Sequence, residues 1–404
     1  MTKRILAAAL LTLTGGTVTS LKAEQVLPTV PSLINNMQQL HPYVNVLTEK
    51  NNQLVYGLDS AQSEFDGRIE QDVSGRVAGY YDGSAAAQRF VKPLGDMNAK
   101  LISEYRVATG DFPVYEEQYN TLSGGEASIG VALSLLQNRS IDKRRVGVSN
   151  AALAIEQYQA ELALSMNDFL YKGLSQYLKW YEVSLKIAAV EELLGTLKYR
   201  REGLSTRLKS GDLAEVDLTE FEASILEQKL ALSQLRQTQR ASAQALAFYW
   251  RNSEGESQVI ASDAALPADI DWPFNITPSQ AARLRNAIMQ HPALAVLRTE
   301  QSVTQNKFRL AENQLLPKLD VKALVAKDMG SGPTSLAETE GKIGLTFSYT
   351  LGNRKAKAEQ ATMRSKLKVL EYEVTLARDQ LNQQFEQAYA YWQQAHEVLD
   401  LQQQ

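Results

Sequence analysis

Residues 129–135 read IGVALSL, and residues 343–349 read IGLTFSY. In the first stretch Ile129, Val131 and Leu133 alternate with small or polar residues, and the second stretch repeats this alternation. A period of two places successive side chains on opposite sides of a β-sheet. The two stretches therefore predict two related strands, and their recurrence indicates an internal duplication.

The landmarks around these strands recur in the same order. HPYVNVL at residues 41–47 matches HPALAVL at residues 291–297, and Asn138-Arg139 parallels Asn353-Arg354. After each Asn-Arg pair, a long helical pattern leads to a cluster of Tyr and Trp. Each copy is therefore expected to have the order helix, strand, loop, strand and very long helix.

The duplication divides the chain into predicted segments. A positive start, a short apolar core and a plausible cleavage site predict a signal peptide at residues 1–23. We place the first repeat at 24–254, an inter-repeat segment at 255–285 and the second repeat at 286–404. The predicted strands lie at about 66–82, 126–137, 316–326 and 341–351, with a long helical hairpin at 140–250 and a helix at 354–404.

The two copies differ in length between their matched landmarks. His41 and Ile129 are 88 residues apart, whereas His291 and Ile343 are 52 residues apart, so the first copy carries 36 additional residues. The addition lies within residues 79–126, which are rich in Gly and Tyr and contain two prolines. We expect an elaborated loop or a small added element there.

The partner strands alternate apolar with charged residues. Leu319 and Val321 oppose Asp320 and Lys322, and residues 68–77 show a similar alternation. An apolar outer face and a polar inner face are typical of a membrane barrel around water. A soluble, half-buried sheet shows the same alternation, so the strand pattern alone leaves both alternatives open.

The number of strands and the composition limit the ways in which this chain could cross or be anchored in a membrane. After residue 23 no apolar run approaches the roughly 18 residues of a spanning helix, which leaves a closed β-barrel as the remaining way across lipid. Four strands cannot enclose a channel, since even eight leave little room inside. We therefore expect several chains to share one barrel, and three chains would give twelve strands. The chain has no cysteine, and hence no lipid-bearing cysteine.

The helical segments are too long for an ordinary domain. Residues 140–210 as one helix would measure about 100 Å, and the apolar spacing of three and four residues indicates coiled-coil-like packing. Gly211 predicts the reversal of the hairpin, and Asp212 is expected to cap the returning helix. The second copy ends without a comparable reversal, so we expect a truncated second hairpin.

Together, the duplication, the paired His-Pro helix starts, the alternating strands and Arg207-x-x-x-Gly211 resemble the outer-membrane efflux protein family, the TolC family. The resemblance covers essentially the whole mature chain. It implies a mainly α-helical trimer, with a twelve-stranded β-barrel in the Gram-negative outer membrane that continues into a periplasmic α-helical barrel. A smaller mixed equatorial region is also implied, for which residues 255–285 and the segment before His41 are candidates.

The resemblance also implies partners and a functional end of the hairpin. The family's hairpin tips form the periplasmic entrance and dock a periplasmic adaptor, which connects to an inner-membrane transporter. The implied entrance or gate residues are Asp217, Asp212 and Glu215, and the implied adaptor-docking residues are Arg207, Gly211, Leu213 and Ala214. The alternative for the three acids is a solvated first helical turn, where acids favour the helix dipole.

The function expected from these patterns is a passive conduit for efflux or type I secretion, without catalysis, cofactor, metal or nucleic acid. The sequence has no P-loop and no HExxH motif, and His41 and His291 are expected to be structural residues at helix starts. A soluble periplasmic coiled-coil adaptor or scaffold is the main alternative. An envelope hydrolase would need a set of catalytic acids, which the scattered acids of this chain do not supply. The cargo is not specified by the sequence.

Overall fold

The computed structural model describes residues 29–95, 97–113, 116, 119–261 and 276–403, and the predicted signal peptide lies outside these ranges. The described chain divides into two compact units. One comprises the segment up to His41 together with Leu170–Pro273, and the other comprises Pro42–Phe169 and Phe274–Gln404. The 67-residue helix α3 (Lys143–Lys209) contributes to both units.

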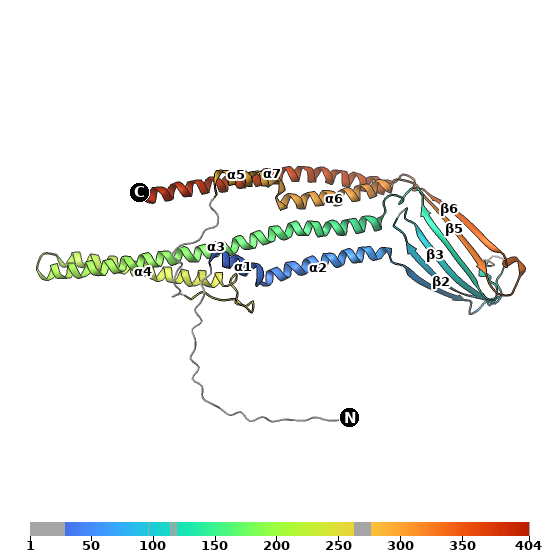
Figure 1. Ribbon diagram of the computed structural model, residues 1–404, viewed down its shortest axis with the longest axis horizontal. Helices are drawn as coiled ribbons and strands as arrows, with labels where there is room; N and C mark the ends of the chain where they lie inside the picture. The colour runs from blue at the N-terminus through green and yellow to red at the C-terminus, as the bar shows by residue number, and fades with distance from the viewer. Residues whose placement is uncertain (1–28, 96, 114–115, 117–118, 262–275, 404) are drawn as a thin grey trace, which may run out of the picture. The chain divides into compact units, whose positions relative to one another are not determined.

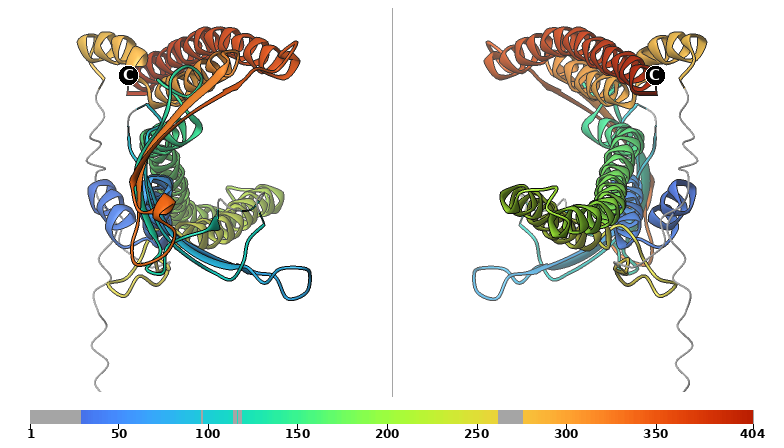
Figure 2. Two further views of the ribbon diagram at one scale, coloured as in Figure 1. Left: turned by 90° about the vertical axis from the view of Figure 1, so that its right-hand side faces the viewer. Right: turned by 90° about the vertical axis from the view of Figure 1, so that its left-hand side faces the viewer.

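The second unit contains one antiparallel sheet with the strand order β1-β2-β3-β4-β5-β6. The sheet is curved into an arc when it is viewed from its end (Figure 2). The strands are β1 (Arg68–Gly75), β2 (Ser84–Pro93), β3 (Lys100–Thr109), β4 (Glu126–Ser134), β5 (Lys318–Asp328) and β6 (Thr339–Ser348). Strands β1, β4, β5 and β6 lie at the four positions predicted from the sequence, although β1 is shorter than predicted.

The sequence analysis predicted four strands per chain, whereas the sheet formed by the described residues has six. The two further strands, β2 and β3, form a hairpin within the segment that we expected to be a loop or a small added element. Left-handed backbone at Met97 (φ 54°) and Asn98 (φ 47°) reverses the chain between them. The Leu94 amide donates to the Ala99 carbonyl at 2.7 Å and closes this connection. The additional residues of the first copy therefore widen the sheet.

Four helices meet the sheet at one end. Helix α2 (Pro42–Gln62) leads toward β1 and α6 (Pro292–Asn313) toward β5, whereas α3 follows β4 and α7 (Arg354–Gln403) follows β6. Since neighbouring strands are antiparallel, all four connections lie at the same end of the sheet (Figure 1). Among the described residues, no helix has the length and the apolar character that crossing a membrane requires.

The helices of this unit pack side by side through contacts between neighbours. The Tyr158 hydroxyl on α3 donates to the Leu47 carbonyl on α2 at 2.9 Å. The Asn306 amide on α6 donates to Ser149 on α3 at 3.0 Å. Lys366 on α7 pairs with Glu300 on α6 at 2.8 Å. These contacts give the neighbour order α2, α3, α6, α7.

The first unit is built around the predicted helical hairpin. Helix α4 (Glu215–Leu246) returns after α3, and helix α1 (Val30–Gln39) completes the unit. Leu33 and Met37 of α1 are fully buried. Tyr177 and Trp180 of α3 each keep only 1% of their surface exposed. The predicted Tyr/Trp cluster of the first copy is therefore a packed core.

Two short helices, one before each of the predicted repeats' His-Pro pairs, begin with the same kind of cap. Helix α1 begins with a capping box between Thr29 and Ser32, and α5 (Pro278–Ala287) begins with one between Thr277 and Gln280. In a capping box, two side chains satisfy backbone N–H groups reciprocally at the helix start. Each short helix then leads to a His-Pro pair. Helix α5 is therefore a counterpart of α1, and it crosses the boundary that was predicted between the inter-repeat segment and the second repeat.

Gly173 on α3 faces Met37 of α1, and replacing it with alanine should destabilise this unit. A Cβ atom at position 173 would lie 2.5 Å from both Sδ and Cε of Met37, and overpacking of this kind costs about 1–3 kcal/mol. Gly195→Ala on the same helix is the matched control, because a Cβ there meets nothing within 4 Å. It should stabilise the helix by about 0.5–1 kcal/mol. Equal effects of the two variants on the melting temperature would contradict the packing.

Candidate functional site

The cross-strand register sorts the charges of the sheet onto one face. Tracing each pair from β1 to β6 places Arg68 in the row of Val91, Ile102, Gly130, Leu324 and Lys342. The face that contains this row carries most of the charged strand residues, and it is called the polar face below. Its bases are Arg68, Arg89, Lys100, Arg106, Lys318, Lys322 and Lys342, and its acids are Glu70, Asp72, Glu104, Glu126, Asp320, Asp328 and Glu340.

Several charges on the polar face pair across neighbouring strands. Arg89 on β2 contacts Glu104 on β3 at 2.6 Å, and Arg106 on β3 contacts Glu126 on β4 at 2.9 Å. The Ser134 hydroxyl on β4 donates to Asp320 on β5 at 2.8 Å. Bases and acids are equally numerous on this face, so it offers a wetted surface with both signs of charge and no strong preference for either.

The opposite face of the sheet is apolar and exposed. Ile343 keeps 84% of its surface accessible, Ile69 69% and Ile129 57%. The charged strand residues on this face are Lys92 and Lys327, which lie near opposite ends of the strands. Lysines near the ends of an apolar band can extend their ammonium groups into water. In a soluble, half-buried sheet these apolar side chains would be covered, and in the described chain they are not.

The hairpin tip is closed by backbone hydrogen bonds. Gly211 has φ +83°, and the Asp212 amide donates to the Arg207 carbonyl at 2.9 Å. This bond and a left-handed glycine are the signature of a Schellman motif, which satisfies the last carbonyls of a helix. The predicted capping role of Asp212 is wrong, because α4 begins at Glu215 with Ala214 as its N-cap and no side-chain cap. The Asp212 carboxylate instead accepts from the Ser210 hydroxyl at 3.1 Å.

The structure gathers the predicted tip residues on one turn. The three acids are exposed, and Glu215 and Asp217 belong to the first turn of α4. Of the predicted docking residues, Leu213 is half-buried and Arg207, Gly211 and Ala214 are exposed. Behind the turn, Arg201 of α3 donates to Glu222 of α4 at 2.6 Å and joins the two helices. The tip therefore presents a compact group of charges to solvent.

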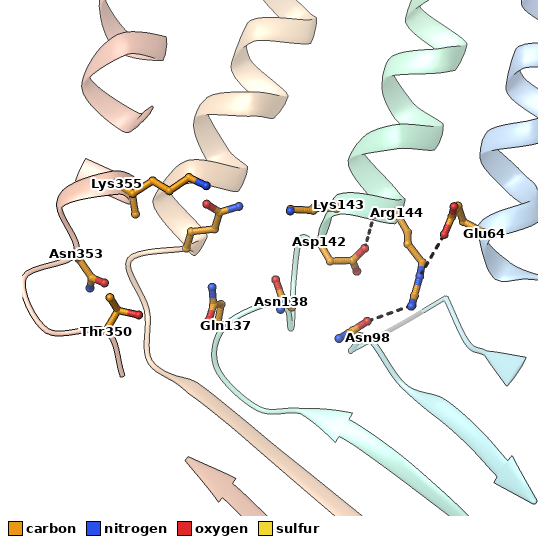
Figure 3. Close-up of a pocket in the computed structure, with 12 residues that line it drawn as sticks. Glu64, Asn98, Gln137, Asn138, Asp142, Lys143, Arg144, Thr350, Asn353 and Lys355 are labelled. Atoms are coloured by element: carbon orange, nitrogen blue, oxygen red, sulfur yellow. Dashed lines mark hydrogen bonds and ion pairs between the residues drawn. The ribbon is translucent and has the colours of Figure 1, made fainter. Parts of the chain in front are cut away.

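A polar cavity of about 650 Å³ lies where the helices meet the sheet (Figure 3). Asp142 at the start of α3 accepts from the Arg144 amide at 2.9 Å and pairs with Arg145 at 2.7 Å. Arg144 in turn contacts Glu64 and Asn98 at 3.9 and 3.5 Å. Arg144 thereby links the start of α3 to the end of the α2 segment and to the β2–β3 turn, so the cavity lies in a joint between the helices and the sheet. Among the described residues, no His, Asp and Glu side chains are grouped to hold a metal ion.

His41 and His291 both contact backbone at helix starts. His41 is 4% exposed, and its Nε2 lies 2.9 Å from the Phe248 carbonyl. Burial, with a further contribution from the Arg251 guanidinium, lowers the pKa of His41 below its ordinary value of 6.5. His291 is the N-cap of α6, and its Nδ1 accepts from the Ala293 amide at 3.3 Å. Both histidines therefore have the structural positions that were predicted.

The sequence analysis did not identify the charged residues that β2 and β3 contribute to the polar face. Arg89, Glu104 and Arg106 belong to the polar face, but their segment was expected to be an elaborated loop or a small added element, without assigned strands. Strand β3 carries a usable signal, because Leu101, Ser103, Tyr105 and Val107 alternate with charged and other residues. In β2, three consecutive alanines hide the alternation.

No protein-family model and no curated protein matches the sequence. Solved structures do match. MtrE, an outer-membrane channel of Neisseria gonorrhoeae, is 11% identical with a TM-score of 0.61, and the match covers 93% of this chain and 75% of MtrE. CusC, described as forming a transmembrane channel, is 10% identical with a TM-score of 0.60, and the match covers 93% of this chain and 78% of CusC. The outer membrane protein VceC of Vibrio cholerae is 13% identical with a TM-score of 0.55, and the match covers 88% of this chain and 75% of VceC. The predicted resemblance is confirmed at the level of the fold, which is that of outer-membrane channels.

The uncapped start of α4 predicts different outcomes for two neighbouring substitutions. Ala214→Ser should stabilise the tip by about 0.5–2 kcal/mol, because a serine N-cap accepts from a free backbone amide. Asp212→Ala should change stability by less than about 0.5 kcal/mol, since the residue is exposed and does not cap the helix. Amide hydrogen exchange in the first turn of α4 measures both effects. A large loss of protection in Asp212→Ala alone would restore the capping role.

Buried His41 predicts that stability falls in acid. Because its pKa is lower in the fold than in the unfolded chain, the unfolded chain binds the proton more readily. The contribution to stability is complete above pH of about 6.5 and is lost as the pH falls from there toward the folded-state pKa. Melting temperatures between pH 5 and 8 should therefore fall more steeply toward acid in the wild type than in His41→Gln. Parallel curves would contradict this prediction.

Proposed function

We propose that this chain, which has the fold of outer-membrane channels, is a subunit of a passive duct across the outer membrane of a Gram-negative cell. Its strands lie in the membrane and its helices extend into the periplasm. The observation that carries the proposal is the sorted sheet, with charges on one face and exposed apolar side chains on the other. Lipid solvates the apolar face, and water fills the space along the polar face.

Partner copies complete the duct. The curved sheet has two ends with no strand partner within the described chain. Exposed apolar residues also remain along the hairpin, including Leu226 and Leu230, which are 63% and 60% accessible. These two residues lie four apart on one face of α4, which is the spacing of a helix packing against a neighbour. A trimer supplies such neighbours, as the resemblance implies.

The tip acids form the periplasmic entrance in this proposal. Carboxylates of Asp217 from several chains meet near the axis, where like charges repel unless they are paired or hydrated. Arg207 and Lys209 lie near the turn and can pair with them. A periplasmic adaptor that competes for these contacts would open the entrance. The energy for transport comes from an inner-membrane transporter, either of an efflux pump or of a type I secretion system.

The alternative, a soluble periplasmic scaffold, requires a cover for the apolar face. Separation of the membranes distinguishes the two functions. Recovery in the outer membrane supports the duct, and recovery of the processed protein in the soluble periplasm rejects it. Loss of drug tolerance in cells that lack the protein favours efflux, whereas accumulation of an unexported protein favours type I secretion.

The assignment of the polar face to the lumen predicts a selective response to charge reversal. Lys322 and Lys327 lie on the same strand, but on the polar and apolar faces respectively. In planar bilayers with a salt gradient, Lys322→Glu should shift the reversal potential toward cation selectivity. Lys327→Glu should leave it unchanged, because that side chain faces away from the lumen. A larger shift from Lys327→Glu would reverse the assignment of the faces.

The entrance role of Asp217 predicts a leakier channel when its charge is removed. Asp217→Asn should raise the open probability in planar bilayers without changing chain number, because neutral amides do not form the ion pairs that close the entrance. Glu220→Gln, at an exposed position one turn further along α4, is the control. An unchanged open probability for Asp217→Asn, with the trimer intact, would reject the gate.

A further inference from the structure

The inserted β2–β3 hairpin has the same two faces as the rest of the sheet. Phe90 on β2 and Tyr105 on β3 share the face of Ile129, and they remain 36% and 44% exposed. On the other side, Arg89–Glu104 and Arg106–Glu126 extend the polar face without interruption from β2 to β4. A loop lying outside the membrane would not need this sorting. The hairpin is therefore built as part of the wall.

The hairpin's turn is also fixed to the joint between helices and sheet. The side-chain amide of Asn98 donates to the Ser134 hydroxyl at 3.0 Å. The backbone amide of Ser134 donates to the Met97 carbonyl at 3.1 Å. Arg144 at the start of α3 donates to the Asn98 side chain at 3.5 Å. Figure 3 shows the contact between Arg144 and Asn98. Together, the three contacts hold β2 and β3 in line with the strands that lead to helices.

The two edge strands of the sheet have the directions that pairing between two copies of the chain requires. Strands β1 and β6 are exposed along their whole lengths of eight and ten residues. Because they are the first and last of six alternating strands, they run in opposite directions. A β6 edge can therefore pair with the β1 edge of a second copy as an antiparallel ladder. Long uncovered edges are normally avoided, since they pair with other chains.

The width of the sheet matches the width of the helices that join it. Strands about 4.8 Å apart and tilted by about 40° each occupy about 6 Å of a barrel's circumference. Six strands therefore span about 38 Å, and four strands would span about 25 Å. Four side-by-side helices at 8–10 Å span about 36 Å. The hairpin brings the sheet to the width of the four helices.

We propose that copies of this chain join β6 to the β1 of the next copy, so that each contributes six strands to one closed wall. This inference rests on the proposed function. A trimer then has eighteen strands instead of the twelve implied by the resemblance. Since barrel diameter grows roughly linearly with strand number, the outer-membrane segment is about 1.5 times as wide. Such a bore suits bulky solutes or polypeptide segments.

Paired cysteines test the joint directly, because the natural chain has none. Asp72→Cys on β1 is combined with one cysteine at a time at residues 339–348 of β6. If the faces match across the joint, even-numbered positions of β6 lie on the side of Asp72, and odd-numbered positions are the controls. Oxidation in outer membranes should link chains into dimers and trimers at one or two adjacent even positions only.

The outcomes separate this inference from the proposed function. Links only within one chain, or an unlinked trimer that still conducts in the outer membrane, overturn the six-strand wall and leave the duct intact. Absence from the outer membrane rejects both. Native mass spectrometry sets the chain number, and two chains, giving twelve strands, also overturn an eighteen-stranded wall.

A deletion provides a second measurement that does not depend on cysteines. Removing residues 84–109 eliminates β2 and β3 while β1 and β4 keep their directions. In end-on electron microscopy images of lipid nanodiscs, the strand region should shrink to about two-thirds of its original diameter. An unchanged diameter in a membrane-inserted trimer of the deletion variant would overturn the proposal.

Discussion

The structure depends above all on the register of its antiparallel ladder. A slip of one residue in any strand would carry that strand's whole set of side chains to the opposite face. On this sheet the slip would place several charges among exposed aliphatic groups. The Arg89–Glu104 and Arg106–Glu126 pairs oppose such a slip, since each requires its two strands to keep their alignment. The separation of polar and apolar faces is thus held by contacts within the polar face itself.

The joint between sheet and helices passes this order on to the rest of the molecule. Asn138 and Asn353, at equivalent places in the two repeats, both adopt left-handed backbone, with φ of 67° and 46°. Asn tolerates this conformation better than most residues. The Asn138 amide donates to the Asn313 side chain at 2.7 Å, and the Asn353 side chain donates to the Leu315 carbonyl at 3.3 Å. Both segments, β4 to α3 and β6 to α7, therefore turn from strand to helix against the end of α6.

Local pattern predicted the elements in which side-chain size and polarity alternate clearly. The repeated IGVALSL and IGLTFSY stretches identified β4 and β6, and unbroken helical spacing identified α3 and α7. Strand β2 was not predicted, because Ala85, Ala86 and Ala87 give little difference in size or polarity between its two faces. The cap of α4 was misplaced because backbone bonds, rather than the Asp212 side chain, end the preceding helix. The role proposed for the tip acids would depend on residues of other chains, which no local pattern encodes.

The position of the β2–β3 turn has a consequence for how such a wall can evolve. A hairpin adds one strand in each direction, so every segment after it keeps its orientation. A single inserted strand would instead invert the remainder of the chain and send the helices that follow it to the opposite end of the sheet. Insertions that keep the orientation of the later segments therefore change the width of the sheet by two strands at a time. Within that constraint, the sheet can widen while the helices that join it keep their directions and their common end.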